Sequence, residues 1–326
     1  MAELSVSEGA RLIAAGELLA FPTETVYGLG ADASSDSAVA KIFAAKGRPA
    51  DHPLIVHVSD RQAALHFAAE IPDFAQRLID AFWPGPLTII VPRKAGVAAA
   101  SAGGQDSIGL RCPSHPLARE LLAECAKLGV HGISAPSANK FGKVSPTTAA
   151  HVKAEFGDAV PVLDGGACDV GIESTIIDCT RGKPVLLRPG VLTPSQLEAA
   201  MGLPLTDPVR AELAEAPAPR ASGTLESHYA PAAPLRLMDA KALQTALDLL
   251  GSDGKNIAIY ARSPLQPKSH QIILRRMPAD ALATAQQLFA VLREFDGHQV
   301  KLIWVETVPA DVAWDGVRDR LQRAAA

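Results

Sequence analysis

The chain has 326 residues, 48% of them hydrophobic and 20% charged, a composition typical of an ordinary globular protein with room for two domains. Its formal net charge of −4 argues against binding nucleic acid through bulk positive charge, although a local basic patch stays open. No apolar run approaches the roughly 20 residues that span a membrane, and the acidic first residues do not resemble a secretory signal, so we expect a cytoplasmic protein without membrane contact.

Residues 1–203 predict an α/β domain with a partly parallel sheet. Ser5 and Glu8 form a capping box that predicts a first helix, and the strand that follows ends at Phe21. Gly47 stands where a helix-ending glycine belongs. Further helices are expected over 36–46, 72–82, 116–127, about 147–156 and 194–201, and further strands over 54–58, 87–91, 107–110, 130–133, 162–164, 174–178 and 184–187.

Residues 204–234 differ from the sequence on either side. Their prolines and alanines follow no sustained period, which predicts a semi-rigid linker. From residue 235 to residue 326 strands and helices alternate again, and this pattern fits a small Rossmann-like or flavodoxin-like α/β/α domain. Strands are expected over 235–238, 257–260, 272–274 and 302–305, and helices over 241–250, 280–295 and 317–321.

The stretch from Ser134 to Thr147 combines hydroxyls, lysines and prolines in a loop between a strand and a helix. Ser145 is expected to cap that helix, with Pro146 in its first turn. Free N–H groups and cations at such a loop suit an anion such as phosphate. A polar loop with a capped helix and no ligand is the alternative.

Two familiar nucleotide motifs are not supported. Residues 28–33 match the glycine pattern of a dinucleotide fingerprint, but Pro22 and the residues after it separate the glycines from the strand, and the fingerprint requires them to follow it directly. The chain also lacks a P-loop motif. The four cysteines form no C-x-x-C pair and predict buried thiols, and we expect no metal site made by protein side chains.

Five clusters at strand or helix ends remain as candidates for one ligand site: residues 23–27, 46–57, 107–111, 134–145, and 173–175 with Arg188. Lys46 and Arg48 offer a point charge and a bidentate fork suited to phosphate or carboxylate. Arg111 follows an apolar strand and needs an anionic partner if it is buried, with a surface ion pair as the alternative. His57 is either a ligand or an ordinary half-buried histidine.

Five motifs in this order resemble the threonylcarbamoyl-AMP synthase family, the YrdC-like proteins. They are residues 21–29 (FPTETVYGL), 46–49 (KGRP), 83–88 (WPGPLT), 135–139 (APSAN) and 173–178 (ESTIID). The match covers about residues 5–200 and implies a YrdC-like twisted mixed sheet with helices. Residues 228–231 (HYAP) and the C-terminal part resemble the long, two-domain form of the family.

The resemblance implies a reaction in which L-threonine, bicarbonate or CO2, and ATP give threonylcarbamoyl-AMP and pyrophosphate. The product would pass to the proteins that transfer the threonylcarbamoyl group to tRNA. Mg²⁺ would accompany ATP, held by substrate phosphates and water. Such a transfer depends on positioning and charge neutralisation more than on a covalent nucleophile, and the sequence offers no convincing nucleophile with its base.

The resemblance also implies roles for single residues. The pairs Lys46 with Arg48, and Ser137 with Asn139, are the family signature and are predicted to be catalytic. L-Threonine would be held by Thr25, His57, Arg111, Ala135 and Thr175. ATP would be held by Arg48, His52, Ser107, Ser137, Ser145, Arg188 and Tyr229. The family usually carries Asn at the position that is His52 here.

Two other functions compete with this one: an RNA-binding module with a weak tRNA contact, and a carbamoyl-AMP-forming relative of the hydrogenase-maturation type. The second would carry zinc-finger cysteines and an acylphosphatase segment, which the sequence lacks. The predicted linker adds one expectation. Residues 222–231 hold hydroxyls and Tyr229 among the prolines, which favours a lid over the ATP site.

Overall fold

The computed structural model describes residues 4–206, 218–223 and 228–326. The chain forms two compact units. Unit 1 comprises Met1–Phe141 and Ser145–Thr224, and unit 2 comprises Gly142–Val144 and Leu225–Ala326.

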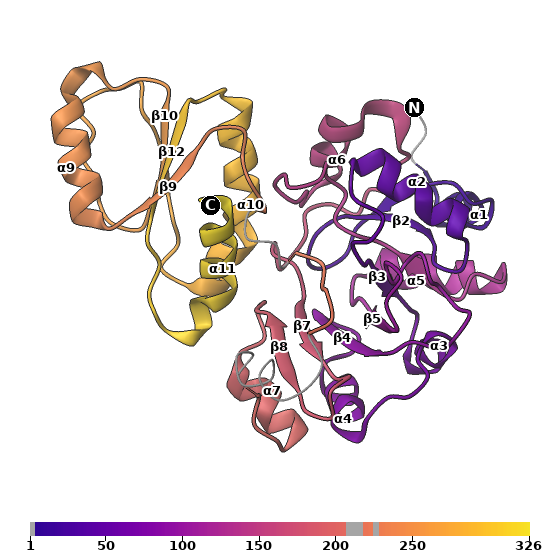
Figure 1. Ribbon diagram of the computed structural model, residues 1–326. Coiled ribbons are helices and arrows are strands. Elements are labelled where there is room, and N and C mark those ends of the chain that lie inside the picture. The colour runs from indigo at the N-terminus through magenta and orange to yellow at the C-terminus, as the bar shows by residue number, and fades with distance from the viewer. Residues whose placement is uncertain (1–3, 207–217, 224–227) are drawn as a thin grey trace. The chain divides into compact units, whose positions relative to one another are not determined.

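Unit 1 is built on an eight-stranded sheet with the order β1-β2-β6-β3-β5-β4-β7-β8 (Figure 1). The pairs β3–β5 and β4–β7 are parallel and the other neighbours are antiparallel, so the predicted partly parallel sheet is confirmed. The strands are β1 (Leu19–Phe21), β2 (Gly28–Asp32), β3 (Ile55–His57), β4 (Leu87–Pro92), β5 (Ser107–Arg111), β6 (Ile133–Ser134), β7 (Thr175–Asp178) and β8 (Val185–Arg188).

The helices of unit 1 begin and end mostly where local signals place them. Ser5 and Glu8 form the predicted capping box, and Gly47 ends its helix in the left-handed conformation with φ of 64°. The helices are α1 (Val6–Ala14), α2 (Asp36–Lys46), α3 (Arg61–Phe67), α4 (Asp73–Phe82), α5 (Pro116–Lys127), α6 (Ala149–Phe156) and α7 (Pro194–Met201). The turn at Gly47 lets Lys46 end one element and Arg48 begin the next loop.

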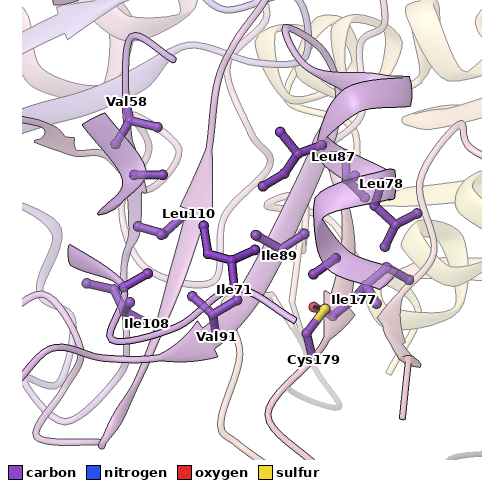
Figure 2. Close-up of a cluster of buried hydrophobic side chains, with 14 of the residues drawn as sticks. Val58, Ile71, Leu78, Leu87, Ile89, Val91, Ile108, Leu110, Ile177 and Cys179 are labelled. Atoms are coloured by element: carbon purple, nitrogen blue, oxygen red, sulfur yellow. Dashed lines mark hydrogen bonds between the residues drawn. The ribbon is translucent and has the colours of Figure 1, made fainter. Parts of the chain in front are cut away.

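One face of this sheet packs into a large apolar core. Leu87, Ile89 and Val91 of β4 alternate into it beside Ile108 and Leu110 of β5 (Figure 2). Helices α3, α4 and α7 supply further members of the same cluster. Because this core fixes the register of β4, β5 and β7, it also sets where the polar residues at the strand ends lie.

Several local predictions for unit 1 need correction. The strand expected over 130–133 reduces to β6, which comprises only Ile133 and Ser134. The N-cap of α6 is Thr148 rather than Ser145, because the Ser145 hydroxyl donates to the carboxylate of Glu173 and Tyr27 N donates to Pro146 O. Residues 162–164 form only an isolated bridge, between Val162 and Ala20, instead of a strand. Helix α3 was not expected.

Residues 28–32 form strand β2, so they do not form a dinucleotide-binding turn. The fingerprint requires its glycines in a turn, whereas Gly28 and Gly30 lie inside a paired strand. A Cβ on Gly30 would lie 2.8 Å from side-chain atoms of both Phe21 and Ile133, so close packing explains that glycine.

Unit 2 has a four-stranded, fully parallel sheet with the order β11-β10-β12-β9. Helix α9 covers one face, and α10 and α11 cover the other (Figure 1). This is the predicted α/β/α arrangement. Its elements are β9 (Leu235–Met238), α9 (Ala240–Leu250), β10 (Ile257–Ala261), β11 (Ile273–Arg276), α10 (Ala281–Gly297), β12 (Leu302–Glu306) and α11 (Asp315–Ala324).

Candidate active site

The topology of unit 1 brings three of the predicted threonine residues to one edge of the sheet. His57 and Arg111 end the parallel strands β3 and β5 and are paired in register. Because β4 runs antiparallel to β5, and β7 parallel to β4, the first residue of β7 lies at the same edge. That residue is Thr175, and it is fully buried.

Arg111 is buried and already has an anionic partner. Its Nη2 atom lies 2.8 Å from Oε1 of Glu24, and the side chains of the pair are only 4% and 7% exposed. The other carboxylate oxygen of Glu24 accepts from the backbone N–H of Ser114 at 3.1 Å. The alternative of a surface ion pair is therefore wrong, because both side chains are buried. Each charge compensates the other away from water.

Two polar atoms at this edge lack protein partners. Among the residues that the structure describes, neither Nδ1 of His57 nor Oγ1 of Thr175 finds a hydrogen-bond partner. Burial, and after it the nearby charge of Arg111, lowers the pKa of His57 to about 3, so its ring is neutral near pH 7. Buried polar atoms without partners are costly, and such atoms at a strand edge suit a polar ligand.

Thr25 follows Glu24, the partner of Arg111, whereas Ala135 lies beside Ile55, at the other end of β3 from His57. Thr25 is fully buried, and its hydroxyl lies 2.9 Å from that of Thr23. Ala135 follows β6 and donates its N–H to the carbonyl of Ile55 at 3.0 Å. Gly190 approaches from the other side, where an added Cβ would lie 2.6 Å from both the backbone N and Oγ1 of Thr175. The close approach requires glycine.

Lys46, the last residue of helix α2, contacts the loop that contains Ser137 and Asn139, which we call the signature loop. Its ammonium donates to the carbonyl of Ser137 at 2.5 Å and to that of Asn139. Burial, and then the charge of Arg48, lowers the pKa of Lys46 well below its usual value. The two signature pairs therefore meet in space, although the contact runs through the carbonyls of the loop rather than the Ser137 hydroxyl or the Asn139 amide oxygen.

Arg48 and Arg188 converge on one residue of the predicted linker. Arg48 Nη2 donates to the carbonyl of Pro53 at 2.9 Å and to the Ser222 hydroxyl at 3.4 Å. Arg188 Nη1 donates to the Ser222 carbonyl at 2.8 Å, and its Nε and Nη2 donate to the carbonyl of Ser174. Two of the predicted ATP residues thus contact the same serine.

Ser107 lines a small cavity beneath this linker segment. The cavity has a volume of about 10 Å³, room for about one water molecule, between the sheet and the linker residues 220–222. Arg220 attaches residues 220–222 to the rest of unit 1. It forms an ion pair with Asp51 at 2.8 Å and a hydrogen bond to the carbonyl of Gly103 at 3.1 Å. The predicted ATP residues therefore border the underside of this segment.

The remaining predicted ATP residues have distinct surroundings. His52 stacks edge-on against Phe141 with ring centroids 5.4 Å apart, and Arg48 lies 5.8 Å from the centroid of the same ring. Burial, and then Arg48, lowers the pKa of His52. Ser145 is fully buried against Glu173.

Tyr229 belongs to unit 2. It is 1% exposed, its ring stacks on Phe289 with centroids 5.4 Å apart, and the guanidinium of Arg320 lies 5.3 Å from its ring centroid. Its contact with ATP stays a prediction. Residues 224–227 of the predicted lid lie outside the described residues.

The structure brings three residues into this site to which the sequence assigned no individual role: Glu24, Glu173 and Ser222. Glu24 and Glu173 stand inside two of the five motifs, so their position in a motif was the available signal. Ser222 carried a weaker signal as a hydroxyl in a proline-rich linker. The sequence does not predict the partner of any of the three, because each partner is more than 25 residues away.

Comparison with known proteins identifies the family of this chain. A family model for Sua5, YciO and YrdC proteins, described as "Telomere recombination", matches residues 11–190, and a model described as the C-terminal domain of threonylcarbamoyl-AMP synthase matches residues 192–326. The chain belongs to the threonylcarbamoyl-AMP synthase family. The resemblance in the sequence and the predicted fold are thereby confirmed.

Relatives in this family match nearly end to end. The threonylcarbamoyl-AMP synthase of Pyrococcus abyssi is 36% identical over 99% of this chain and 94% of its own length, and that of Bacillus subtilis is 36% identical over 98% and 92%. A solved structure of P. abyssi Sua5 complexed with L-threonine matches with a TM-score of 0.86 at 36% identity, covering 98% of this chain and 94% of that one. Thermococcus kodakarensis HypF matches over 57% of this chain and 24% of its own, at 20% identity and a TM-score of 0.50, and shares only the fold of that part.

Two further observations concern metal and membrane. Within the described parts of the chain, no three His, Cys, Asp or Glu side chains are grouped so that they could hold a metal ion. No helix in those same parts is long and apolar enough to cross a membrane. Mg²⁺ bound to ATP phosphates stays a prediction.

Proposed function

We propose that this chain makes threonylcarbamoyl-AMP from L-threonine, bicarbonate or CO2, and ATP, with release of pyrophosphate, for threonylcarbamoyladenosine modification of tRNA. The observation that carries the proposal is the buried edge formed by Arg111, His57 and Thr175. It joins a cation to two polar atoms that lack partners among the described residues, and a small polar amino acid supplies partners for all of them. L-Threonine is the ligand in the complex of the similar P. abyssi protein.

In this proposal the pocket recognises two parts of the amino acid, its α-carboxylate and its side-chain hydroxyl. Arg111 binds the α-carboxylate through a charge-assisted fork. Neutral His57 and the Thr175 hydroxyl bind the side-chain hydroxyl of threonine, which can both donate and accept. Thr25 and Ala135 shape the wall. Because the low pKa keeps His57 neutral, this recognition does not depend on its titration near pH 7.

The chemistry takes two steps. In the first, the α-ammonium of threonine loses two protons in all and its nitrogen adds to the carbon of CO2, which gives the carbamate. The second step forms one bond and breaks another. The carbamate of threonine attacks the α-phosphorus of ATP through an oxygen, and the bond from that phosphorus to the bridging oxygen of the β-phosphate breaks, so that pyrophosphate leaves. Lys46, Arg48 and Arg188 neutralise the phosphate charge, and the loop of Ser137 and Asn139 donates N–H groups. Lys46 keeps the loop in position through its two carbonyl contacts.

Incubation of the full chain with ATP, L-threonine and bicarbonate tests this function. We expect pyrophosphate and an acyl-adenylate only when all three substrates are present. Ser137→Ala together with Arg48→Ala should remove most of the activity, while Arg61→Ala, which breaks an exposed ion pair with Asp80, should leave it unchanged. Pyrophosphate release without threonine would contradict the proposal.

We further propose that linker residues 220–222 form a lid that must leave before ATP binds. A cavity of about 10 Å³ cannot hold a nucleotide, and Ser222 occupies donors of Arg48 and Arg188 that ATP would need. Arg220→Ala removes an exposed ion pair worth about 0–1 kcal/mol and the bond to Gly103, so it should tighten ATP binding severalfold. Weaker ATP binding by Arg220→Ala, measured against Arg61→Ala, would contradict a lid that closes the empty site.

A further inference from the structure

Glu24 is a buried carboxylate without an assigned role, although it contacts Arg111 directly. It stands in the loop between β1 and β2, next to Thr25, and is 5% exposed. Its ion pair with Arg111 spans 2.8 Å. A carboxylate so far from water is expensive to keep charged, so its position at a ligand edge invites a functional explanation.

The carboxylate of Glu24 has capacity left for another donor. Oε1 lies beside Arg111, and Oε2 accepts from Ser114 N. An ionised carboxylate offers about four lone-pair positions, so these two contacts use about half of them. By this count, Glu24 keeps acceptor capacity for one further donor, such as a cationic ligand group at this edge.

A free amino acid carries two oppositely charged groups, the α-carboxylate and the α-ammonium, both bonded to the α-carbon. When Arg111 binds the carboxylate, the ammonium must lie within a few ångströms of that guanidinium, because both groups share the α-carbon. Glu24 is the anion in direct contact with Arg111. The geometry points to Glu24 as the residue that binds the α-ammonium of the amino-acid substrate, an inference that rests on the proposed function.

Glu173 is the other buried carboxylate near this edge, and its contacts direct it elsewhere. It accepts from the hydroxyl of Ser145, a predicted ATP residue, and its charge raises the pKa of Lys46 against the larger effect of burial. Glu173 therefore lies among the residues of the proposed ATP site rather than those of the threonine site. Glu24 and Arg111 form a matched pair of opposite charges that suits a zwitterion.

A ligand pair separates this role from a purely structural one. L-Threonine is compared by calorimetry with 2,3-dihydroxybutanoate of the same configuration, which carries a hydroxyl where threonine carries its ammonium. The unaltered chain should prefer threonine by about 10- to 150-fold, the range of one charge-assisted hydrogen bond. In Glu24→Gln, which keeps the shape and can still accept from Ser114, that preference should fall to about onefold.

Two variants calibrate the result. Glu24→Asp keeps the charge and should retain most of the preference, and Glu17→Gln, which breaks an exposed ion pair with Lys41, should change neither affinity. Equal losses for both ligands in Glu24→Gln would mean that Glu24 only orients Arg111, and this would overturn the inference. If the unaltered chain binds no threonine, the proposed function itself fails.

A measurement on the unaltered chain keeps the inference testable if Glu24→Gln does not fold. As the pH rises past the pKa of the free α-amino group, threonine loses its positive charge while the hydroxy acid does not change. Threonine affinity should then fall toward that of the hydroxy acid. An affinity that stays constant through this range would show that no anion binds the ammonium.

Discussion

Replacement of Arg111 by alanine should have two separable effects, one on threonine binding and one on stability. Loss of the charge-assisted fork to the α-carboxylate should cost about 1.5–3 kcal/mol, which weakens threonine binding by about 10- to 150-fold. ATP affinity should be almost unchanged, because the proposed ATP residues contact Ser222, Pro53 and Ser174 and not Arg111. Calorimetry with each ligand measures both affinities.

The effect on stability follows from the buried partner. Glu24 is 7% exposed at its side chain, so Arg111→Ala leaves a buried carboxylate without its counter-charge, a loss of about 3–5 kcal/mol in the free energy of unfolding. The double variant Arg111→Ala/Glu24→Gln removes that charge and should recover much of the stability, but not the threonine affinity. Urea denaturation of the single and double variants measures this difference.

Two results would refute this reasoning. Equal losses of affinity for ATP and threonine would assign Arg111 to the general framework of the site. A double variant as unstable as Arg111→Ala would show that the buried charge of Glu24 is not the source of the instability. Either result would require a different account of the ion pair.

Three further predictions concern the same pocket. Serine lacks one methyl group of threonine, so threonine should be preferred by about 1–3 kcal/mol, measured as pyrophosphate release with each amino acid, and equal rates would argue against a fitted pocket. Gly190→Ala should weaken threonine binding and destabilise unit 1 by about 1–3 kcal/mol, because its Cβ meets Thr175 at 2.6 Å, whereas Gly297→Ala meets nothing within 4 Å and should leave both unchanged. His57 has a folded-state pKa of about 3, below its ordinary value of about 6.5, so the unfolded chain takes up a proton between these values and the free energy of unfolding should fall, as the pH decreases from 6.5 toward 3, by up to about 1.4 kcal/mol per pH unit. Urea denaturation across this range should show a shallower fall in His57→Gln, and an unchanged slope would count against a buried neutral ring.

Local rules explain why many elements could be predicted. The capping boxes at Ser5 and Thr193 satisfy backbone N–H groups within one helical turn, and Gly47 ends α2 because it adopts the left-handed conformation at little cost. These effects act over a few residues, so the sequence contains them completely. The capping prediction at Ser145 failed because a distant carboxylate, Glu173, takes its hydroxyl.

The site residues divide in the same way. The five motifs determined the family and thereby the fold, and they contain the candidates Lys46, Arg48 and Ser137. Arg111 lies outside the motifs and became a candidate as a cation at the end of an apolar strand. These residue types suit carboxylate and phosphate groups whatever their surroundings. Only the tertiary structure decided that Arg111 is paired with Glu24 and that Lys46 binds the carbonyls of the signature loop. It also decided that Ser222 accepts hydrogen bonds from both Arg48 and Arg188. Such contacts depend on strand order and register, which the apolar core of β4, β5 and β7 sets by packing residues far apart in the chain, and no local pattern encodes a partner that packing alone brings within reach.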